Sequence, residues 1–130
     1  MNYLLDTHSF IWFSEDDPNL PKRVKSILED RQHNIYLSLV SLWEMAIKVS
    51  LDKLELKKSL DDITTEVSQS RIQWLPLTSE HIVRLATLPF HHRDPFDRTL
   101  IAQGLVEQFV IVTKDDVFND YGVATQWKDS

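Results

Sequence analysis

The stretch Phe109-Val110-Ile111-Val112-Thr113-Lys114-Asp115-Asp116 indicates the fold of this chain more clearly than any other. Its first four residues form a continuous apolar run, which is typical of a parallel strand covered by helices on both faces. Two adjacent carboxylates follow, close to where such a strand ends. In open parallel sheets, ligands bind beyond the carboxyl ends of the strands. The stretch therefore predicts an α/β sheet with acidic side chains at its ligand-binding edge.

Short apolar runs elsewhere predict further strands, and the full set of predicted strands is residues 2–6, 34–38, 72–77, 109–112 and 123–127. Apolar residues at helical spacing predict helices at residues 7–14, 21–30, 41–48, 60–70, 79–88 and 95–106. The fifth helix is expected to be capped by Thr78 or Ser79 and to bury Ile82, Val83 and Leu85. Strands that alternate with helices, without hairpin signals, predict an open and mostly parallel α/β sheet in one domain.

The composition excludes several classes of protein. The chain has 130 residues, of which 42% are hydrophobic and 26% charged, as in ordinary globular domains. It has no cysteine, which rules out disulfides and thiolate zinc sites, and two glycines, too few for a glycine-rich phosphate loop. No apolar run reaches the length of a membrane span, and no basic stretch opens a signal peptide, so we expect a cytoplasmic protein without a membrane partner.

The net charge of −6 and the pI of about 5.2 argue against a protein that holds nucleic acid by bulk electrostatic attraction. An acidic enzyme can still act on nucleic acid when metal ions neutralise its site and a local basic rim contacts phosphate. The balance of charge therefore restricts the mode of binding and leaves nucleic-acid chemistry open.

Carboxylates from separate segments are expected to converge at one edge of the sheet. Asp6 ends the first strand, Asp115 and Asp116 follow the fourth, and Asp97 opens the helix that leads into the fourth strand. Glu44 lies early in the helix after the second strand. Because the carboxyl ends of parallel strands meet at one edge, these side chains should lie close together.

Each of these acids also has a local structural explanation. Asp94 fits a helix N-cap, which places Asp97 in the first turn, where a carboxylate interacts with free N–H groups. Ser41 and Glu44 have the spacing of a capping box, and Glu44 and Lys48 have the spacing of an ion pair within a helix. These local roles explain the acids one at a time and do not explain their convergence.

Four carboxylates about 6 Å apart would repel one another by about 3 kcal/mol per pair at an effective dielectric constant of about 20. Such a cluster must take up protons, attract basic groups or bind a cation. Hard oxygen ligands without cysteine suit Mg²⁺ or Mn²⁺. Divalent ions at such a site activate water for displacement at phosphorus, which predicts metal-dependent phosphodiester hydrolysis.

Four motifs in order resemble the PIN-domain ribonucleases, in particular the VapC-like toxins of bacterial toxin–antitoxin pairs. The resemblance extends from about Asn2 to Tyr121. The motifs are Leu4-Leu5-Asp6-Thr7-His8, Ser41-Leu42-Trp43-Glu44, His92-Arg93-Asp94-Pro95-Phe96-Asp97-Arg98 and Thr113-Lys114-Asp115.

The resemblance implies a single PIN domain over residues 1–130, folded as a three-layer α/β/α sandwich around a mostly parallel sheet of about five strands. It implies an endoribonuclease that hydrolyses RNA and depends on Mg²⁺ or Mn²⁺. It also implies a homodimer held by a cognate antitoxin whose basic tail can fill the acidic site.

The resemblance further assigns roles to individual residues. The catalytic and metal-binding acids are Asp6, Glu44, Asp97 and Asp115. Thr7 occupies a hydroxyl position that helps to order the site. Further candidates are Asp94, which also fits a cap, Asp116, which adjoins a matched acid, and Arg98, which either contacts substrate phosphate or neutralises the acids.

Two other functions remain open on the residues alone. A phosphotransfer enzyme would use Asp6 as a nucleophile and usually needs a second acid two residues later, where this chain has His8. A non-enzymatic α/β module would accept a basic partner peptide in the acidic cleft. His91 and His92 are expected to face solvent, with proton transfer or RNA contact as the alternative. The aromatic residues Trp12, Trp43 and Phe96 are expected to pack in the core or at a dimer contact, with stacking on nucleobases as the alternative.

Overall fold

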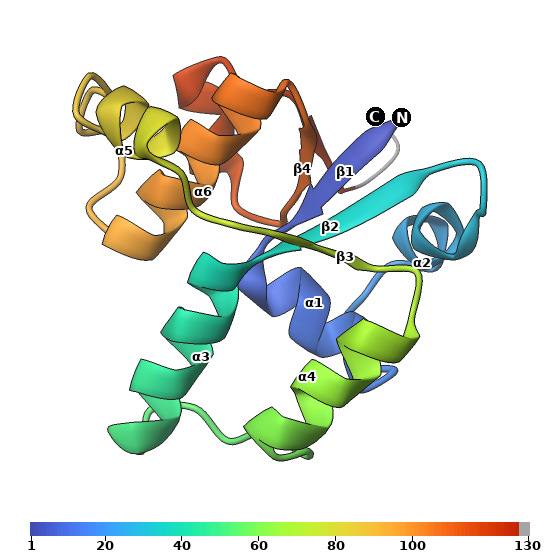
Figure 1. The fold of residues 1–130 in the computed structure, drawn as a ribbon. Helices are drawn as coiled ribbons and strands as arrows, with labels where there is room; N and C mark the ends of the chain where they lie inside the picture. Colours follow the sequence, from blue (N-terminus) through green and yellow to red (C-terminus); the bar gives the residue numbers. More distant parts are fainter. Residues whose placement is uncertain (128–130) are drawn as a thin grey trace.

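The computed structural model describes residues 1–127, which form a five-stranded, fully parallel sheet with helices on both faces (Figure 1). The order of the strands is β3-β2-β1-β4-β5. Their bounds are β1 Asn2–Leu5, β2 Asn34–Ser38, β3 Gln73–Leu75, β4 Val110–Val112 and β5 Thr125–Gln126. The predicted fold class, an α/β/α sandwich with a sheet of about five strands, is confirmed.

The first strand occupies the centre of the sheet, between two strands that come from distant parts of the chain. It pairs with β2 through Leu5↔Leu37 and with β4 through Leu5↔Val112. The carboxyl ends of β1 and β4 therefore lie side by side, which is where ligands bind in open parallel sheets.

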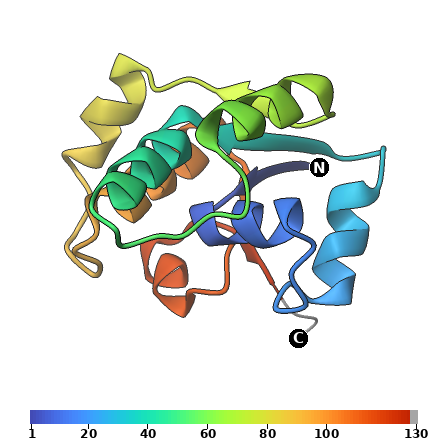
Figure 2. The same ribbon diagram turned by 90° about the horizontal axis from the view of Figure 1, so that it is seen from below.

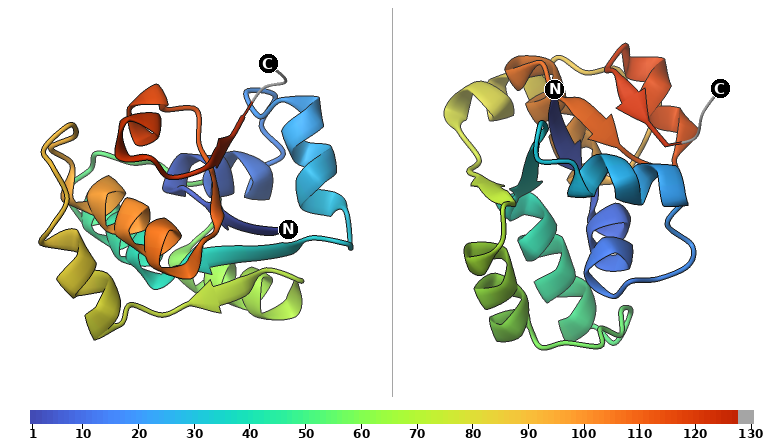
Figure 3. Two further views of the ribbon diagram at one scale, coloured as in Figure 1. Left: turned by 90° about the horizontal axis from the view of Figure 1, so that it is seen from above. Right: turned by 90° about the vertical axis from the view of Figure 1, so that its right-hand side faces the viewer.

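The helices differ little from the predicted ranges. They are α1 Thr7–Ser14, α2 Lys22–Glu29, α3 Leu39–Ser50, α4 Leu60–Gln69, α5 Ser79–Leu85 and α6 Pro95–Glu107, and a 3-10 helix η1 follows at Asp116–Tyr121. Figures 2 and 3 show that α5 and α6 lie together, apart from α1, α2 and α4. Within residues 1–127, no helix combines the length and the apolar character needed to cross a membrane.

Alternate residues of β1 point to two separate cores, as the pleat of a strand requires. Tyr3 and Leu5 contribute to a cluster with buried residues of α1, α2, α3 and α4. Leu4 belongs to the opposite cluster, with Ile101 of α6 and with Phe118 of η1. The central strand is thus buried on both faces, which explains its apolar sequence.

Two details of the predicted helices are wrong. Helix α3 begins at Leu39 and is capped by Ser38, whose hydroxyl accepts a hydrogen bond from the Val40 amide, so Ser41 is not the cap and forms no capping box with Glu44. Helix α5 is capped by Thr78, but Ile82 and Val83 are 52% and 68% exposed, so they do not face inward.

His81 is the residue that α5 buries in their place. Its Nδ1 accepts a hydrogen bond from the Thr78 amide, and its Nε2 lies 2.7 Å from Glu107 on α6. A polar contact between helices therefore orients α5, and apolar spacing over two turns does not reveal it.

Candidate active site

Asp6 lies at the junction of β1 and α1, directly beside β4. Its backbone amide donates a hydrogen bond to the Val112 carbonyl at 3.0 Å, which extends the pairing of β1 with β4. Its carboxylate caps α1 by accepting from the Ser9 amide at 2.9 Å. Burial raises the pKa of Asp6, and hydrogen bonds from Ser9 and Thr113 offset only part of that effect. This carboxylate is therefore costly to charge unless a cation is near.

Asp94 and Asp97 open helix α6, as the sequence predicts. Asp94 Oδ1 accepts from the amides of Phe96 at 2.8 Å and Asp97 at 3.2 Å, so Asp94 acts as the N-cap. The Asp97 side chain lies nearer the other acids. Burial, followed by the charges of Asp94, Glu44 and Asp6, raises the pKa of Asp97 to about 7. The acids that converge here thus repel one another enough to retain a proton near neutrality.

Glu44 lies on α3, where it is 2% exposed and has partners for both of its oxygens. The Thr7 hydroxyl donates to Glu44 Oε1 at 2.6 Å, and the Lys48 ammonium forms an ion pair with Oε2. The ion pair expected from the i,i+4 spacing is thus present. Burial acts to lower the pKa of Lys48, but the hydrogen bond and charge of Glu44 raise it overall. These two contacts fix the position of the Glu44 side chain on the side of the site formed by α3.

His92 lies between two of the acids, although the sequence predicts that it faces solvent. Its Nε2 lies 2.9 Å from Asp97 Oδ2 and 3.3 Å from Asp115 Oδ2. Its Nδ1 accepts a hydrogen bond from the Asp94 amide at 3.3 Å, and its buried Nε2, although close to both carboxylates, is not hydrogen-bonded to either of them. No sequence signal identifies this contact, because only the fold of the 88–94 loop brings the ring over Asp115.

The two carboxylate oxygens of Asp115 have different partners. Oδ1 caps η1 by accepting from the Val117 amide at 3.0 Å, and Oδ2 faces His92. Donor atoms of His92, Asp97 and Asp115 all lie within 4.8 Å of one another. Oxygen donors at this separation suit one Mg²⁺ or Mn²⁺, which prefers carboxylates and water. The acidic residues present therefore fit such an ion.

The remaining candidates lie around this centre. Asp116 is exposed, one residue beyond Asp115. Arg98 is 7% exposed, and its guanidinium donates to the carbonyls of Pro89 at 2.7 Å and Leu88 at 3.3 Å. Within residues 1–127, no carboxylate lies in ion-pair contact with Arg98. Its contacts attach α6 to the loop before it.

A hollow of about 410 Å³ opens beside the acids. It is lined by Asp6, His8, Trp12, Asp97, Lys114 and Asp115. Glu44 and Asp94 do not line it, so they lie behind the three acids that reach the hollow. Reagents that enter here meet Asp6, Asp97 and Asp115 directly.

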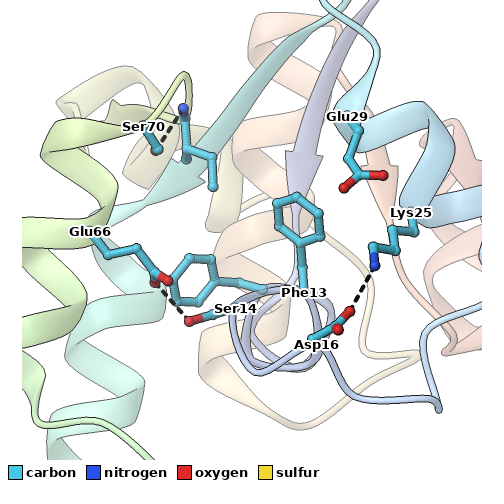
Figure 4. A pocket seen from close by; sticks show the side chains of 9 residues that line it. Phe13, Ser14, Asp16, Lys25, Glu29, Glu66 and Ser70 are labelled. Carbon is cyan, nitrogen blue, oxygen red and sulfur yellow. Dashed lines mark hydrogen bonds and ion pairs between the residues drawn. The ribbon is translucent and has the colours of Figure 1, made fainter.

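A different cavity, of about 340 Å³, lies away from the acids among α1, α2 and α4 (Figure 4). Its lining includes the rings of Phe10 and Phe13. At its rim Ser14 donates to Glu66 at 2.7 Å, and Lys25 donates to Asp16 at 2.8 Å. The hollow beside the acids and this cavity, which two phenylalanine rings help to line, share no lining residue.

Comparison with solved structures supports the fold. The chain is similar to one in the crystal structure of VapBC2 from Rickettsia felis bound to a DNA fragment from its promoter, with a TM-score of 0.74 and 17% identity over 98% of this chain and 100% of that one. It is also similar to FitAcB from Neisseria gonorrhoeae, with a TM-score of 0.67 and 20% identity over 95% of each chain. DNA-bound VapBC from Salmonella typhimurium gives a TM-score of 0.70 and 14% identity over 97% of each chain.

Curated protein sequences give no match. The family model of the PIN domain matches residues 3–124, nearly the whole chain. The fold and the site define the general class of protein: an α/β domain with a parallel sheet and acidic side chains at the carboxyl ends of its central strands. The chain belongs to the PIN-domain family, a family of nucleases that generally use divalent metal ions.

Proposed function

We propose that this protein is a metal-dependent endoribonuclease that hydrolyses RNA phosphodiester bonds, and that it is the toxin of a toxin–antitoxin pair. The observation that carries the proposal is the hollow that Asp6, Asp97 and Asp115 line together, although they come from distant segments. Membership of the PIN-domain family supports the nuclease assignment. We place its action in the cytoplasm.

In this proposal, Asp6, Glu44, Asp97 and Asp115 are the catalytic acids and hold Mg²⁺ or Mn²⁺. When bound, the ion supplies an activated water and neutralises charge on the phosphate. The Ser9 amide orients Asp6, and the Val117 amide orients Asp115 through its other oxygen. Asp97 holds a proton near neutrality and releases it when a cation replaces the repulsion of the neighbouring acids.

Several other residues support these acids. Thr7 and Lys48 hold the two carboxylate oxygens of Glu44 in place. Asp94 fixes the first turn of α6 and adds negative charge next to Asp97. We assign Arg98 to positioning of α6, and Asp116 to the outer rim, where it can attract a hydrated cation.

The toxin assignment includes a cognate antitoxin and a homodimer. The fold likeness to chains of VapBC complexes supports a protein partner of this kind. Large apolar side chains exposed on α3 and α5 support self-association; they are Leu39, Trp43, Ile82 and Val83. Within residues 1–127, no helix could place the protein in a membrane, so we propose no membrane partner.

The experiment that tests the proposal is cleavage of total cellular RNA by antitoxin-free protein, with Mn²⁺, with Mg²⁺ and with a chelator. Discrete fragments should appear with either metal, and both the chelator and Asp97→Asn should abolish them. Asp61→Asn is the matched control, because Asp61 is an exposed acid on α4, far from the hollow. Cleavage that persists in Asp97→Asn, or that is lost equally in Asp61→Asn, would contradict the proposed site.

Failure to cleave any RNA, together with binding of a basic peptide that does not depend on divalent ions, would favour the alternative. The protein would then be a binding module with an acidic cleft. Titration of the wild-type protein with Mn²⁺ separates the two, because the module has no need of the ion.

A further inference from the structure

Two hollows adjoin at the rim of the acidic site. The hollow of about 410 Å³ that contains Asp6 and Asp97 shares Lys114 and Asp115 with a hollow of about 580 Å³. The larger one is lined mainly by polar residues between β4 and β5, with Trp127 at its edge. A ligand at the acids can therefore extend past Lys114 into a second recess.

Aromatic side chains border this path on its inner side. Trp12 lines the smaller hollow and Trp127 lines the larger one, and their ring centroids are 5.9 Å apart with an interplanar angle of 51°. Both rings are half-buried: each packs partly against the core and reaches one of the hollows. Ring faces of this kind are platforms on which unpaired nucleobases stack.

Lys114 provides a positive charge at the same place. Its Nζ lies 5.9 Å from the Trp12 ring centroid, and no carboxylate among residues 1–127 forms an ion pair with it. This is unusual beside Asp115 and Asp116, in a chain with a net charge of −6. A cation that is exposed and unpaired next to a cluster of acids is available to a phosphate group.

We infer that Trp12, Lys114 and Trp127 form a nucleotide subsite next to the acids, which holds one unpaired base and the phosphate adjacent to the cleaved one. The inference rests on the proposed function, because it assigns the direction in which the RNA leaves the acids. Trp12 stacks on the base, Lys114 pairs with the phosphate, and Trp127 closes the platform. The site favours RNA over a basic peptide, because Lys114 repels positive charge.

The test is binding of a fluorescein-labelled single-stranded oligouridine to Asp97→Asn protein in Mn²⁺, measured by fluorescence anisotropy. Trp12→Leu should weaken binding about tenfold, which corresponds to about 1.4 kcal/mol. Trp43→Leu is the matched control, because Trp43 is 56% exposed on α3 and lines neither hollow. A duplex of the same length should bind equally to all of these proteins, since its bases are not free to stack.

The salt dependence separates a phosphate contact from a structural role. Lys114→Gln should reduce the slope of log Kd against log salt concentration by about 0.7, the value for one phosphate of a single strand. Lys114→Arg should restore that slope, and Trp12→Leu should leave it unchanged. The inference would be overturned if the Asp97→Asn protein bound oligouridine equally well with and without Trp12→Leu. It would also be overturned if Lys114→Gln left the slope unchanged.

Because Trp12 also packs against the core, a second measurement avoids dependence on Trp12→Leu. Saturating oligouridine should quench the tryptophan emission of the Asp97→Asn protein, and Trp12→Phe combined with Trp127→Phe should remove most of that quenching while Trp43→Phe retains it. Quenching that persists when both Trp12 and Trp127 are replaced would contradict the subsite. The binding results are interpreted separately from cleavage. If the wild-type protein cleaves RNA but the subsite variants bind normally, only the inference is refuted. If binding depends on the subsite but the wild-type protein does not cleave RNA, only the proposed function is refuted.

Discussion

The Thr7 hydroxyl donates a 2.6 Å hydrogen bond to Glu44 Oε1, across 37 residues of sequence. Thr7 is the first residue of α1 and follows Asp6, whereas Glu44 belongs to α3. One short hydrogen bond therefore links the helices that follow β1 and β2, and it fixes Glu44 relative to Asp6. The Ser41 hydroxyl, 3.0 Å from Thr7 Oγ1, completes this buried polar contact.

Replacing the Thr7 hydroxyl should affect both stability and activity. Thr7→Val keeps the shape but leaves Glu44 Oε1 buried without this donor, which should lower the free energy of unfolding by about 1–3 kcal/mol. Thr7→Ser keeps the hydroxyl and should lose less. Urea denaturation measures the stability of both Thr7 variants. Thr65→Val, at an exposed position of α4, is the control. A loss for Thr7→Ser as large as that for Thr7→Val would contradict a specific role of the hydroxyl.

Metal binding should depend on pH through Asp97. Because the pKa of Asp97 is raised to about 7 in the metal-free protein, binding below that pH must displace a proton. The Mn²⁺ affinity should fall about tenfold per unit of pH below about 7 and level off above it. Calorimetric titration at several pH values checks this, with proton release read from buffers of different ionisation enthalpy. An affinity that is constant between about pH 5 and 8 would contradict the assignment.

The same raised pKa predicts how stability varies with pH without metal. The folded protein holds a proton on Asp97 over a range in which the unfolded chain has released it. The stability that Asp97 contributes is therefore fully present below about pH 4 and is lost as pH rises through about 7. Asp97→Asn should remove this decrease and make the metal-free protein more stable at about pH 8. Urea denaturation in chelator, compared between the two proteins, provides the measurement.

His92 should stabilise the metal-free site without acting as a metal ligand. Its Nε2 lies 2.9 Å and 3.3 Å from carboxylate oxygens of Asp97 and Asp115, so His92→Ala should destabilise the protein in chelator and leave its Mn²⁺ affinity unchanged or higher. Asp115→Asn should instead lower that affinity at least tenfold. Parallel calorimetric titrations separate the roles. A loss in His92→Ala as large as that in Asp115→Asn would identify the histidine as a ligand.

Arg98 should matter for stability because of the shape of its guanidinium. It donates to the Pro89 and Leu88 carbonyls and lies over the Phe90 ring, 4.1 Å from its centroid. Lysine cannot reproduce the fork, so Arg98→Lys should cost about 1–3 kcal/mol in thermal or urea unfolding. Arg93→Lys, at an exposed neighbouring position, is the control. A stable Arg98→Lys protein that no longer binds RNA would instead favour a direct phosphate contact.

Gly104 should resist substitution, although glycine is a poor helix former. A Cβ at this position would lie 2.8 Å from Ile111 Cδ1 and 3.0 Å from Val123 Cγ2. The helix propensity gained in Gly104→Ala is about 1 kcal/mol, and overpacking a core costs about 1–3 kcal/mol. A net destabilisation of about 1 kcal/mol is expected in urea unfolding. Gly104→Ala combined with Ile111→Val should recover part of it, and a stabilised single variant would show that Ile111 moves aside freely.

The features that sequence predicts well are those that neighbouring residues determine. Asp94 and Pro95 identify the start of α6 because a cap and a first-turn proline are local signals. The run of residues 109–112 identifies a strand buried on both faces. The approach of Asp6 to Asp115 was also predictable, since the carboxyl ends of parallel strands share one edge.

The features that sequence missed depend on contacts through space. His92 meets Asp97 and Asp115 only because of the path of the loop before α6, and no spacing rule describes that path. For α5, the apolar spacing correctly predicts that Leu85 faces the core but wrongly predicts it for Ile82 and Val83, because the helix buries His81, which Glu107 of another helix contacts. The cap of α3 was placed three residues late because two serines, Ser38 and Ser41, both fit the pattern.

The pairing of β1 with β4 also determines when the protein can acquire its activity during synthesis. Asp6 is translated long before β4, the strand that lies beside it, and before Asp115, which follows β4. A nascent chain that stops before β4 contains Asp6 and Asp97 but lacks Asp115, the third acid that lines the hollow. Under the proposed function, the toxin is harmless to the ribosome's own RNA until β4 and Asp115 have been made, and a cotranslationally available antitoxin meets each molecule as it first becomes active.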